Sequence, residues 1–366
     1  MKKLKIAQLA PVEETVPPRK YGGTELVVSN LTEELVGMGH EVHLLASGDS
    51  KTSGKLVKLV PKAIRVMTKD VGQEKLRESW KYVSLSEAFK YLLNNKFDII
   101  HQHVGWRVSP FEKSFNVPFV TTCHGPLNEE YVKMVFDSNK NNNYISISDN
   151  QRKDNRNLNF ISTVYNGIDV NLFKYSEKAD KEYYAFLGRM SYEKGPKEAI
   201  LAAKKAGVKL KMAAKIDASD MPYFKKEVEP LINNKDIEYI GEIGPKEKDK
   251  FLGNAKALLA PINWEEPFGL YFVESMATGT PVISVKRGSA PEIIKNNVTG
   301  YLVDKKDTVG LIAKKIRIIE SMDSLSYIKM RKASRDNVVD NFSIKSMSNS
   351  YLAAYTKAIA GYKKKK

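Results

Sequence analysis

The chain has 366 residues, of which 42% are hydrophobic and 28% are charged, and this size and composition fit a globular protein of two domains. Its single cysteine, Cys123, excludes an internal disulfide and a cysteine-held metal cluster. No apolar run approaches the roughly 20 residues that cross a bilayer, and the run that follows the basic start is too short for a signal peptide. We therefore expect a cytoplasmic protein.

The net charge is +16, and its distribution decides which partners it favours. Both halves of the chain are mildly basic, whereas residues 341–366 contain lysines and no acidic residue. Such a tail, which ends in Lys363–Lys366, can attract nucleic acid or an anionic membrane. Because no nucleic-acid-binding motif is present, we expect no nucleic-acid partner. We interpret the tail as a solvated terminus or as a peripheral contact with an anionic membrane.

The first half of the sequence predicts alternating strands and helices. Gly22-Gly23 forms a turn with Thr24 as the N-cap, and apolar residues then recur at helical spacing from Leu26 until Gly39 ends the helix. Near-continuous apolar runs between helices indicate a parallel sheet that is covered on both faces. The predicted strands are Lys5–Leu9, Val42–Ala46, Phe97–His101, Val117–Thr122 and Tyr144–Ser148.

The second half repeats this alternation of short apolar runs and amphipathic segments. Its predicted strands are Tyr183–Leu187, Lys209–Ala213, Ile237–Ile240, Ala257–Ala260 and Val282–Ser284. Its predicted helices are Pro196–Ala206, Tyr223–Asn233, Lys246–Asn254, Leu270–Thr278 and a final one over Ser343–Ala360.

The predicted fold class is therefore α/β, with two doubly wound, Rossmann-like domains whose parallel sheets face each other across a ligand cleft. We expect the domains over 1–170 and 171–340. The remaining residues, 341–366, are expected to form a helix and a basic tail that cross back to the first domain.

The most informative segment runs from Trp264 to Glu274. A strand ends just before it, the loop carries Glu266, and Gly269 opens a helix whose first backbone amides lack partners and so make an anion site. Glu274 lies about one turn into this helix and can face the same pocket. Carboxylates suit sugars because each can accept two hydroxyl hydrogen bonds. The pattern predicts that Glu266 and Glu274 hold two different sugar rings.

Glu266 and Glu274 form the E-x7-E signature of retaining GT-B glycosyltransferases, and with Gly279-Thr280-Pro281-Val282 the segment resembles family 4. The resemblance extends over essentially the whole chain. It implies a retaining hexosyltransferase of the GT-B fold that uses a UDP- or GDP-sugar and a carbohydrate, lipid-linked or small-molecule acceptor. Other motifs that resemble the family's are Tyr21-Gly22-Gly23-Thr24-Glu25, Gly39-His40-Glu41-Val42, Asn166-Gly167-Ile168-Asp169, Gly188-Arg189 with Lys194-Gly195, and Arg287-Gly288-Ser289-Ala290-Pro291-Glu292.

The resemblance also implies roles for four charged residues. Arg189 and Lys194 match the basic pair that contacts the donor diphosphate, where two cations would stabilise the charge that the leaving group gains. Glu266 matches the acid that binds hydroxyls of the transferred sugar, and Glu274 matches the acid that binds the ribose. We expect both cations at the open cleft and not in a core, so that replacing either one leaves the fold intact.

Backbone groups complete the donor site that the resemblance implies. Phe268, Gly269 and Leu270 would offer backbone amides to the sugar and the phosphate. Gly22 and Gly23, from the other domain, would let the backbone approach the diphosphate, because glycine has no side chain in the way. These residues are the predicted donor-binding set beside Glu274.

One of the five histidines is a predicted catalytic residue. His124, in the segment Thr122-Cys123-His124-Gly125-Pro126, resembles the family histidine near the reacting carbon. His101 and His103 form a His-x-His pattern, but two imidazoles without acidic partners nearby make a poor metal site. We expect those two residues to line the floor of the cleft.

No Asp-x-Asp motif occurs in the chain. In the other large glycosyltransferase fold that motif holds a divalent metal, so Arg189 and Lys194 would supply here the positive charge that the metal supplies there. We therefore expect no metal and no cofactor. The resemblance further implies that the acceptor attacks the sugar on the same face from which the diphosphate departs, and that the leaving phosphate oxygen takes the acceptor's proton.

The sequence also bears on other enzyme and binding classes. A nicotinamide dehydrogenase needs G-x-G-x-x-G between a strand and the helix it opens, whereas Gly37-Met38-Gly39 stands at the end of a helix. A sugar phosphorylase or epimerase on the same fold stays open. A basic nucleic-acid-binding protein has only the charge in its favour. The sequence does not specify the donor base, the hexose or the acceptor.

Overall fold

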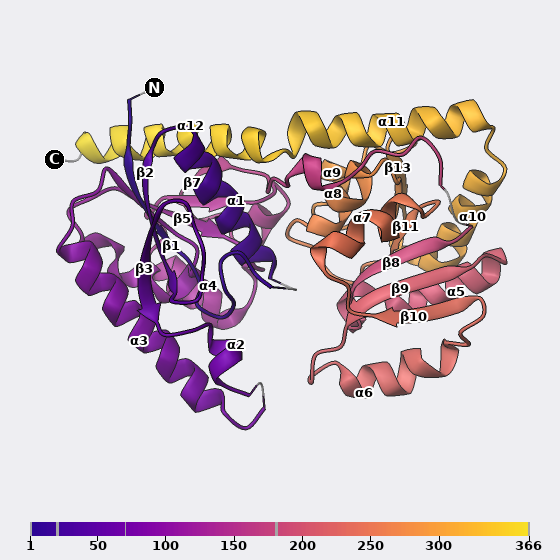
Figure 1. Cartoon of the computed structure of the whole chain (residues 1–366), viewed down its shortest axis with the longest axis horizontal. Helices are drawn as coiled ribbons and strands as arrows, with labels where there is room; N and C mark the ends of the chain where they lie inside the picture. The colour runs from indigo at the N-terminus through magenta and orange to yellow at the C-terminus, as the bar shows by residue number, and fades with distance from the viewer. Residues whose placement is uncertain (1, 20–21, 70, 180–181, 365–366) are drawn as a thin grey trace. The chain divides into compact units, whose positions relative to one another are not determined.

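The computed structural model describes residues 2–19, 22–69, 71–179 and 182–364. The chain divides into two compact units, which are Met1–Gly167 with Ile344–Lys366, and Ile168–Ser343. Each unit contains one sheet with helices packed on it (Figure 1). The predicted fold class, two doubly wound α/β halves with parallel sheets, is confirmed.

A seven-stranded parallel sheet in the order β3-β2-β1-β4-β5-β6-β7 forms the centre of the first unit. Its middle strands, such as β4 and β5, are buried throughout because they have neighbours on both sides and helices on both faces. The strands are β1 (Lys5–Leu9), β2 (Glu41–Ser47), β3 (Lys55–Val60), β4 (Ile99–Gln102), β5 (Phe119–Cys123), β6 (Tyr144–Ser146) and β7 (Phe160–Thr163).

Helices cover this sheet. In α1 (Gly23–Gly37) the residues that repeat at helical spacing, among them Val28, Leu31 and Leu35, are buried. α1 packs against β2 and against the final helix α12 (Ile344–Lys363), so the C-terminal helix is part of this unit. The other helical segments are α2 (Ile64–Met67), α3 (Glu74–Leu93), η1 (Gly105–Arg107), η2 (Ser109–Ser114), α4 (Glu130–Ser138) and η3 (Gln151–Asp154).

The second unit is built on a six-stranded parallel sheet in the order β10-β9-β8-β11-β12-β13. Its strands are β8 (Tyr184–Arg189), β9 (Leu210–Lys215), β10 (Ile237–Gly241), β11 (Leu258–Ala260), β12 (Val282–Val285) and β13 (Gly300–Val303). Its helical segments are η4 (Val170–Leu172), η5 (Tyr192–Lys194), α5 (Pro196–Ala206), α6 (Met221–Tyr223), η6 (Phe224–Val228), η7 (Glu229–Leu231), α7 (Pro245–Gly253), α8 (Leu270–Ala277), α9 (Ala290–Ile293), η8 (Lys305–Asp307), α10 (Thr308–Glu320) and α11 (Ser324–Asn341).

Three strands that the sequence does not predict, β3, β7 and β13, all lie at an edge of a sheet. An edge strand is covered on fewer sides than a central one, so its sequence need not be a continuous apolar run. β3 reads Lys-Leu-Val-Lys-Leu-Val and is half exposed, and β7 is only partly buried along its whole length. Apolar runs therefore identify the middle of each sheet better than its borders.

The helix predicted over Tyr223–Asn233 is only partly correct. The chain makes a short α-turn, a π-turn over Phe224–Val228 and a 3₁₀ turn over Glu229–Leu231 instead of one regular helix. Pro230 lacks a backbone N–H and clashes with the preceding turn. Its position inside the predicted helix explains why the regular α-helical ladder does not continue.

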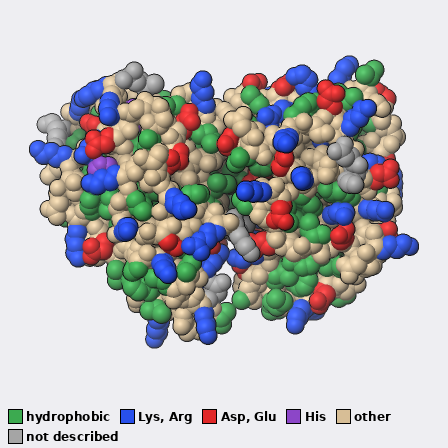
Figure 2. All heavy atoms as spheres, in the orientation of Figure 1, with side chains coloured by type: hydrophobic (Ala, Val, Ile, Leu, Met, Phe, Trp, Pro, Cys, Tyr) green, Lys and Arg blue, Asp and Glu red, His purple; other side chains and the backbone are tan. Residues whose placement is uncertain are grey.

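Neither unit contains, among the helices that the structure describes, one that is long and apolar enough to cross a membrane. On the face drawn in Figure 2, Lys and Arg side chains are spread over both units among Asp and Glu side chains. Of the basic tail, Lys363 ends α12 and Lys364 follows it, whereas Lys365 and Lys366 lie outside the described residues.

Candidate active site

Glu266 is buried in the second unit, and one of its carboxylate oxygens has three donors. The ammonium group of Lys194 pairs with Oε2 of Glu266. The Tyr271 hydroxyl donates to the same oxygen at 2.9 Å, and the Trp264 indole nitrogen donates at 3.2 Å. The Lys194 nitrogen also lies 5.0 Å and 4.9 Å from the centroids of the Trp264 and Tyr271 rings. These contacts form a closed cage around one ion pair.

The expected open position of Lys194 is wrong. Its side chain is 9% exposed, and that of Glu266 is 7% exposed. The two charges compensate each other inside the unit, where an unpaired charge would be costly. Replacing Lys194 alone therefore leaves a buried carboxylate without its cation, and we no longer expect such a variant to keep full stability.

The loop that carries Glu266 is held by the glycine turn at Gly288. The amide of Gly288 donates to Glu265 at 2.7 Å, and the amide of Ser289 donates to the carbonyl of Glu266 at 2.9 Å. Gly288 has a φ of 54°, and a Cβ there would come within 2.3 Å of the Glu266 backbone nitrogen. Glycine is therefore required where this turn meets the Glu266 backbone.

Helix α8 begins directly after this loop. Its N-cap, Gly269, has a φ of 81° and no side chain that could cap the helix, and Leu270 is the first helical residue. Phe268 is buried, and its carbonyl accepts a 2.5 Å hydrogen bond from the Ser289 hydroxyl. The positive end of the helix dipole thus lies at Phe268–Leu270, beside the Glu266 cage.

Glu274, on α8, is also buried and paired. The ammonium group of Lys248 lies 2.7 Å and 3.0 Å from its two carboxylate oxygens. Lys248, on α7, precedes Glu274 by 26 residues, and no motif in the sequence singled it out. Both carboxylates of the E-x7-E pair therefore have a lysine partner within the second unit.

Arg189 ends β8 and is surrounded by carboxylates. Its guanidinium lies 3.2 Å from Glu193, 3.6 Å from Asp217 and 3.7 Å from Asp220. Burial raises the pKa of the Asp220 carboxyl. The guanidinium is held in place by these groups, and a diphosphate that binds it must compete with them.

His124 follows β5 in the first unit and belongs to a chain of hydrogen bonds. Its Nε2 lies 2.8 Å from Nδ1 of His103, and Nε2 of His103 lies 2.8 Å from the side-chain oxygen of Gln8. Since that oxygen can only accept, His103 donates through Nε2 and accepts through Nδ1. His124 then donates through Nε2, which leaves its Nδ1 as an acceptor.

The chain continues from Gln8 to the C-terminal helix. The Gln8 amide donates to the Tyr355 hydroxyl at 3.1 Å, and His101 lies between Tyr355 and Thr122, at 2.7 Å from each. Burial lowers the pKa of His124 to about 4 and the pKa of His101 and of His103 well below the ordinary value. The histidines at this end of the sheet are therefore neutral at pH 7.

Gly22 and Gly23 mark the start of α1, with Gly22 as the N-cap. A Cβ on Gly22 would come within 2.7 Å of Pro18, so the loop before the helix packs closely on this glycine. Tyr21, the first residue of the motif, lies outside the described residues. No group of three or more His, Cys, Asp and Glu side chains that could hold a metal ion occurs within the described ranges.

The fold defines a class of proteins. A sucrose-phosphate synthase from Thermosynechococcus elongatus has a solved structure with a TM-score of 0.81 and 19% identity, over 98% of this chain and 100% of that one. The Anabaena protein HepE in complex with UDP-glucose has a TM-score of 0.72 and 17% identity, over 97% of this chain and 100% of that one. These likenesses show the GT-B fold.

The sequence defines the family. The family model described as Glycosyl transferases group 1 matches residues 168–337, and the family model described as Glycosyltransferase Family 4 matches residues 21–172. The 2-deoxystreptamine N-acetyl-D-glucosaminyltransferase of Niallia circulans is 25% identical, over 92% of this chain and 97% of its own length. The chain belongs to family 4 of the glycosyltransferases, a retaining family, and is a glycosyltransferase that uses a nucleotide-sugar donor.

Proposed function

We propose that this glycosyltransferase moves a hexosyl unit from a UDP- or GDP-sugar to a carbohydrate, lipid-linked or small-molecule acceptor, with retention and without a metal. The observation that carries the proposal is the buried cage of Lys194, Trp264 and Tyr271 around Glu266. Such a cage fixes a carboxylate and a cation side by side, as binding a sugar hydroxyl next to a phosphate requires. The HepE complex with UDP-glucose makes UDP-sugars the first donors to test.

In the proposed reaction, Arg189 and Lys194 bind the donor diphosphate and stabilise the charge that it gains on leaving. Binding requires an exchange of partners, because the carboxylates beside Arg189 and Glu266 beside Lys194 already accept from these cations. Once Lys194 turns to the phosphate, Glu266 is released to accept hydrogen bonds from the transferred sugar. This exchange couples the arrival of the diphosphate to the binding of the sugar.

The remaining donor contacts come from α8 and from the glycine loop. Glu274 would accept hydrogen bonds from the ribose hydroxyls in place of Lys248, which now fills that position. The backbone amides of Phe268, Gly269 and Leu270 would face the sugar and the phosphate at the positive end of α8. Gly22 and Gly23 would let the backbone of the first unit approach the diphosphate.

His124 would act as a neutral acceptor in the proposed reaction. The hydrogen-bond chain from Gln8 through His103 leaves Nδ1 of His124 to accept, and a hydroxyl of the transferred sugar can donate to it. The leaving phosphate oxygen takes the proton of the attacking acceptor hydroxyl on the same face. The first unit would thus bind the acceptor and add His124 and the glycine loop to the donor site, and the second unit would supply the other donor contacts.

Hydrolysis of a panel of UDP-, GDP- and ADP-sugars without acceptor tests the proposal. We expect slow release of one nucleoside diphosphate, and a Glu266→Gln variant should abolish the release while an exposed control, Glu229→Gln, should not. A wild-type protein that leaves every donor intact and binds no nucleoside diphosphate would contradict the assignment. Faster sugar transfer to inorganic phosphate than to any sugar acceptor would indicate a phosphorylase instead.

We also propose that the basic tail, Lys363–Lys366, attaches the enzyme to an anionic membrane if its acceptor is lipid-linked. Each lysine near such a surface contributes about 1 kcal/mol at low salt. Deleting the tail should then weaken sedimentation with anionic vesicles and leave turnover of a soluble acceptor unchanged. Equal vesicle binding with and without the tail would assign it to solubility alone.

A further inference from the structure

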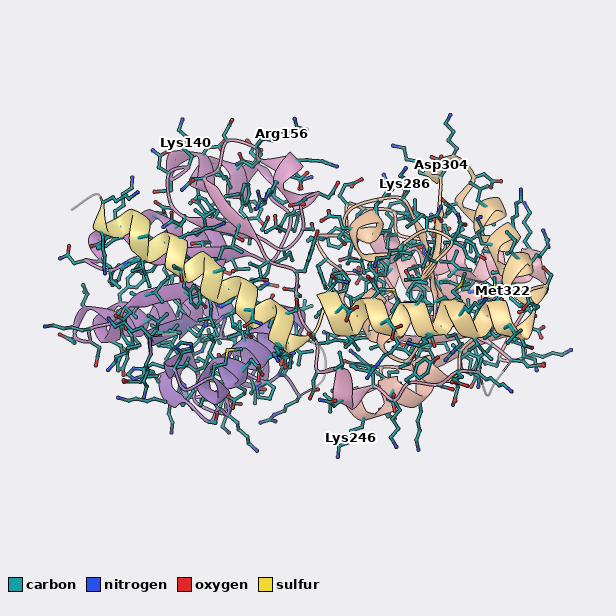
Figure 3. All side chains as sticks on the ribbon, turned by 90° about the horizontal axis from the view of Figure 1, so that it is seen from above. Lys140, Arg156, Lys246, Lys286, Asp304 and Met322 are labelled. Carbon is teal, nitrogen blue, oxygen red and sulfur yellow. The ribbon has the colours of Figure 1, made fainter. Side chains whose placement is uncertain are left out.

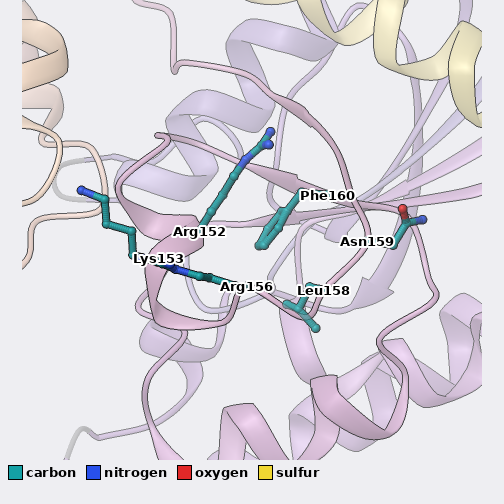
Figure 4. Close-up of a pocket in the computed structure, with 6 residues that line it drawn as sticks. All are labelled: Arg152, Lys153, Arg156, Leu158, Asn159 and Phe160. Carbon is teal, nitrogen blue, oxygen red and sulfur yellow. The ribbon is translucent and has the colours of Figure 1, made fainter.

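The first unit contains a basic pocket that the proposed reaction does not use (Figure 4). Its volume is about 460 Å³. Three of its lining residues are cations, two are apolar, and none is acidic. The lining residues are Arg152, Lys153, Arg156, Leu158, Asn159 and Phe160.

The pocket is joined to the His124 loop through Gln151. This buried side chain donates to the carbonyl of Cys123 at 2.8 Å and to the carbonyl of Gly125 at 2.7 Å, so it holds the residues on both sides of His124. Arg152 and Lys153 directly follow Gln151 on η3. The two cations are therefore carried by the same turn that positions the predicted catalytic histidine.

The sheet register places Arg152 beside the same strand end. The Arg152 Nε donates to the Ser146 hydroxyl at 2.8 Å, and Ser146 on β6 pairs in register with Cys123 on β5, the residue before His124. Neighbouring strands lie about 4.8 Å apart. Ser146, which anchors Arg152, and Cys123, which precedes the His124 loop, are therefore adjacent at the carboxyl ends of their strands.

The pocket combines cationic groups with an apolar wall. The Arg152 guanidinium lies 5.2 Å from the centroid of the Phe160 ring, and Phe160 packs against the buried cluster that contains Leu158. The ammonium group of Lys153 donates to the uncharged amide oxygen of Asn150 at 3.0 Å. Arg156 is exposed and is labelled in the view from above (Figure 3). Asp149, 3.9 Å from Arg152, offsets part of this charge.

We propose that this pocket binds the phosphate or carboxylate group of the acceptor substrate, while the acceptor's reacting hydroxyl reaches toward His124. The inference rests on the proposed function and deepens it, because it assigns the acceptor to the class of anionic small molecules or lipid phosphates. Lys153 and Arg156 bind the oxyanion, and Leu158 and Phe160 contact the carbon skeleton that carries it. Charge-assisted bonds of this type favour an anionic over a neutral acceptor.

Binding of sn-glycerol 3-phosphate, L-malate and glycerol to the full-length protein tests the pocket. The titrations are made by calorimetry at low salt, after saturation with UDP, GDP or ADP so that phosphate cannot enter the donor site. We expect one or both anions to bind and glycerol not to bind. Lys153→Gln with Arg156→Gln should weaken the anion at least tenfold. The matched control, Lys58→Gln with Lys62→Gln, removes two exposed charges near the opposite edge strand and should change nothing.

The outcomes separate this inference from the proposed function. Unchanged anion affinity in the Lys153/Arg156 variant, or no anion binding by the wild type, would overturn the pocket assignment. If the wild type does not bind any nucleoside diphosphate, that result would instead overturn the proposed donor site. Sedimentation with phosphatidylglycerol vesicles identifies the source of the anion: reduced sedimentation of the pocket variant indicates a lipid phosphate, and unchanged sedimentation indicates a free one.

Discussion

The two units hold their predicted site residues by opposite means. In the second unit every predicted charged side chain is paired with opposite charge: Lys194 with Glu266, Glu274 with Lys248, and Arg189 with three carboxylates. In the first unit His124 ends a chain of neutral hydrogen bonds that passes through His103 and Gln8 to Tyr355. The predicted site residues of the second unit are therefore ionic and paired with opposite charge, and the hydrogen-bond chain that ends at His124 in the first unit is neutral.

This difference indicates how each half would respond to a ligand. Paired charges are satisfied before the donor binds, so a diphosphate and a ribose must replace existing partners, which favours only ligands that offer equally strong contacts. The histidine chain needs no exchange, because its hydrogen bonds already leave the Nδ1 of His124 as an acceptor. We expect the second unit to discriminate among donors and the first unit to provide a rigid, pre-oriented surface.

The largest expected effect comes from breaking the charge pairing at Lys194 or Arg189. Lys194→Ala and Arg189→Ala should each lower turnover about 10- to 100-fold, since each contact to the leaving phosphate contributes roughly 1.5–3 kcal/mol. The double variant should do little worse than the poorer single, because both cations act on one leaving group. Lys194→Arg should rescue only partly, because its planar fork is not a compact point charge. Lys204→Ala, an exposed change on α5, is the turnover control.

Melting curves distinguish the catalytic from the structural part of the Lys194 effect. Removing one partner of a buried ion pair costs about 3–5 kcal/mol, so Lys194→Ala should melt earlier than wild type. Adding Glu266→Gln should restore much of the stability and none of the turnover. Normal melting together with wild-type turnover in Lys194→Ala would show that the diphosphate assignment is wrong.

A smaller effect is expected at Glu274. Glu274→Ala should weaken binding of the nucleoside diphosphate about tenfold, the loss of one charge-assisted hydrogen bond, and lower kcat less, because the ribose does not react. Calorimetry measures the affinity, with Glu229→Ala as an exposed control in the same unit. Equal affinity of the wild type and Glu274→Ala for the nucleoside diphosphate would show that this carboxylate does not bind the ribose.

The neutral state of His124 in the first unit can be tested by the pH dependence of the stability. Burial lowers the pKa of His124 to about 4, whereas an unfolded histidine titrates near pH 6.5. Its contribution to stability is therefore complete above about pH 6.5 and is lost as the pH falls toward 4, where only the unfolded chain takes up the proton.

The measurement is the urea midpoint of the first unit at pH 7 and at pH 5. The midpoint should fall further in the wild type than in His124→Asn. Burial also raises the pKa of Glu25 and of Glu112 to about 7, which acts in the opposite direction, and the comparison between the two proteins cancels that contribution. An equal fall in both would show that His124 is not held neutral.

The smallest expected effect is that of a chelator. Because Arg189 and Lys194 supply the positive charge at the proposed leaving group, turnover in excess EDTA should equal turnover without it. A loss of activity that Mg²⁺ or Mn²⁺ restores would contradict the metal-independent proposal and would give the carboxylates around Arg189 a new significance.

Several features of the site were accessible from the sequence because they are local. Glu266 lies in the loop before α8 and Glu274 lies about one turn into this helix, so their spacing alone brings them close to each other along the chain. The glycine turn at Gly288 is local as well, and its positive φ agrees with the residue type. Tyr271 belongs to the same helix, and its spacing of five residues from Glu266 was the one signal that could have revealed it.

The long-range partners had no such signal. Lys248 reaches Glu274 across 26 residues, and His101 reaches Tyr355 across 254 residues. Such pairs depend on how α7 packs beside α8, and on the return of α12 to the first unit. No periodicity in the chain records which of its many lysines or tyrosines will be brought to a given acceptor.

The sequence by itself determined the central strands, the helices between them and the E-x7-E segment, because burial on both faces imposes continuous apolar runs and a helix start imposes its own local residues. Only the tertiary structure decided the edge strands, the cage around Glu266 and the neutral state of His124. Edge strands have fewer apolar requirements, and both a charge's partner and the burial that shifts a pKa arise from residues far away along the chain.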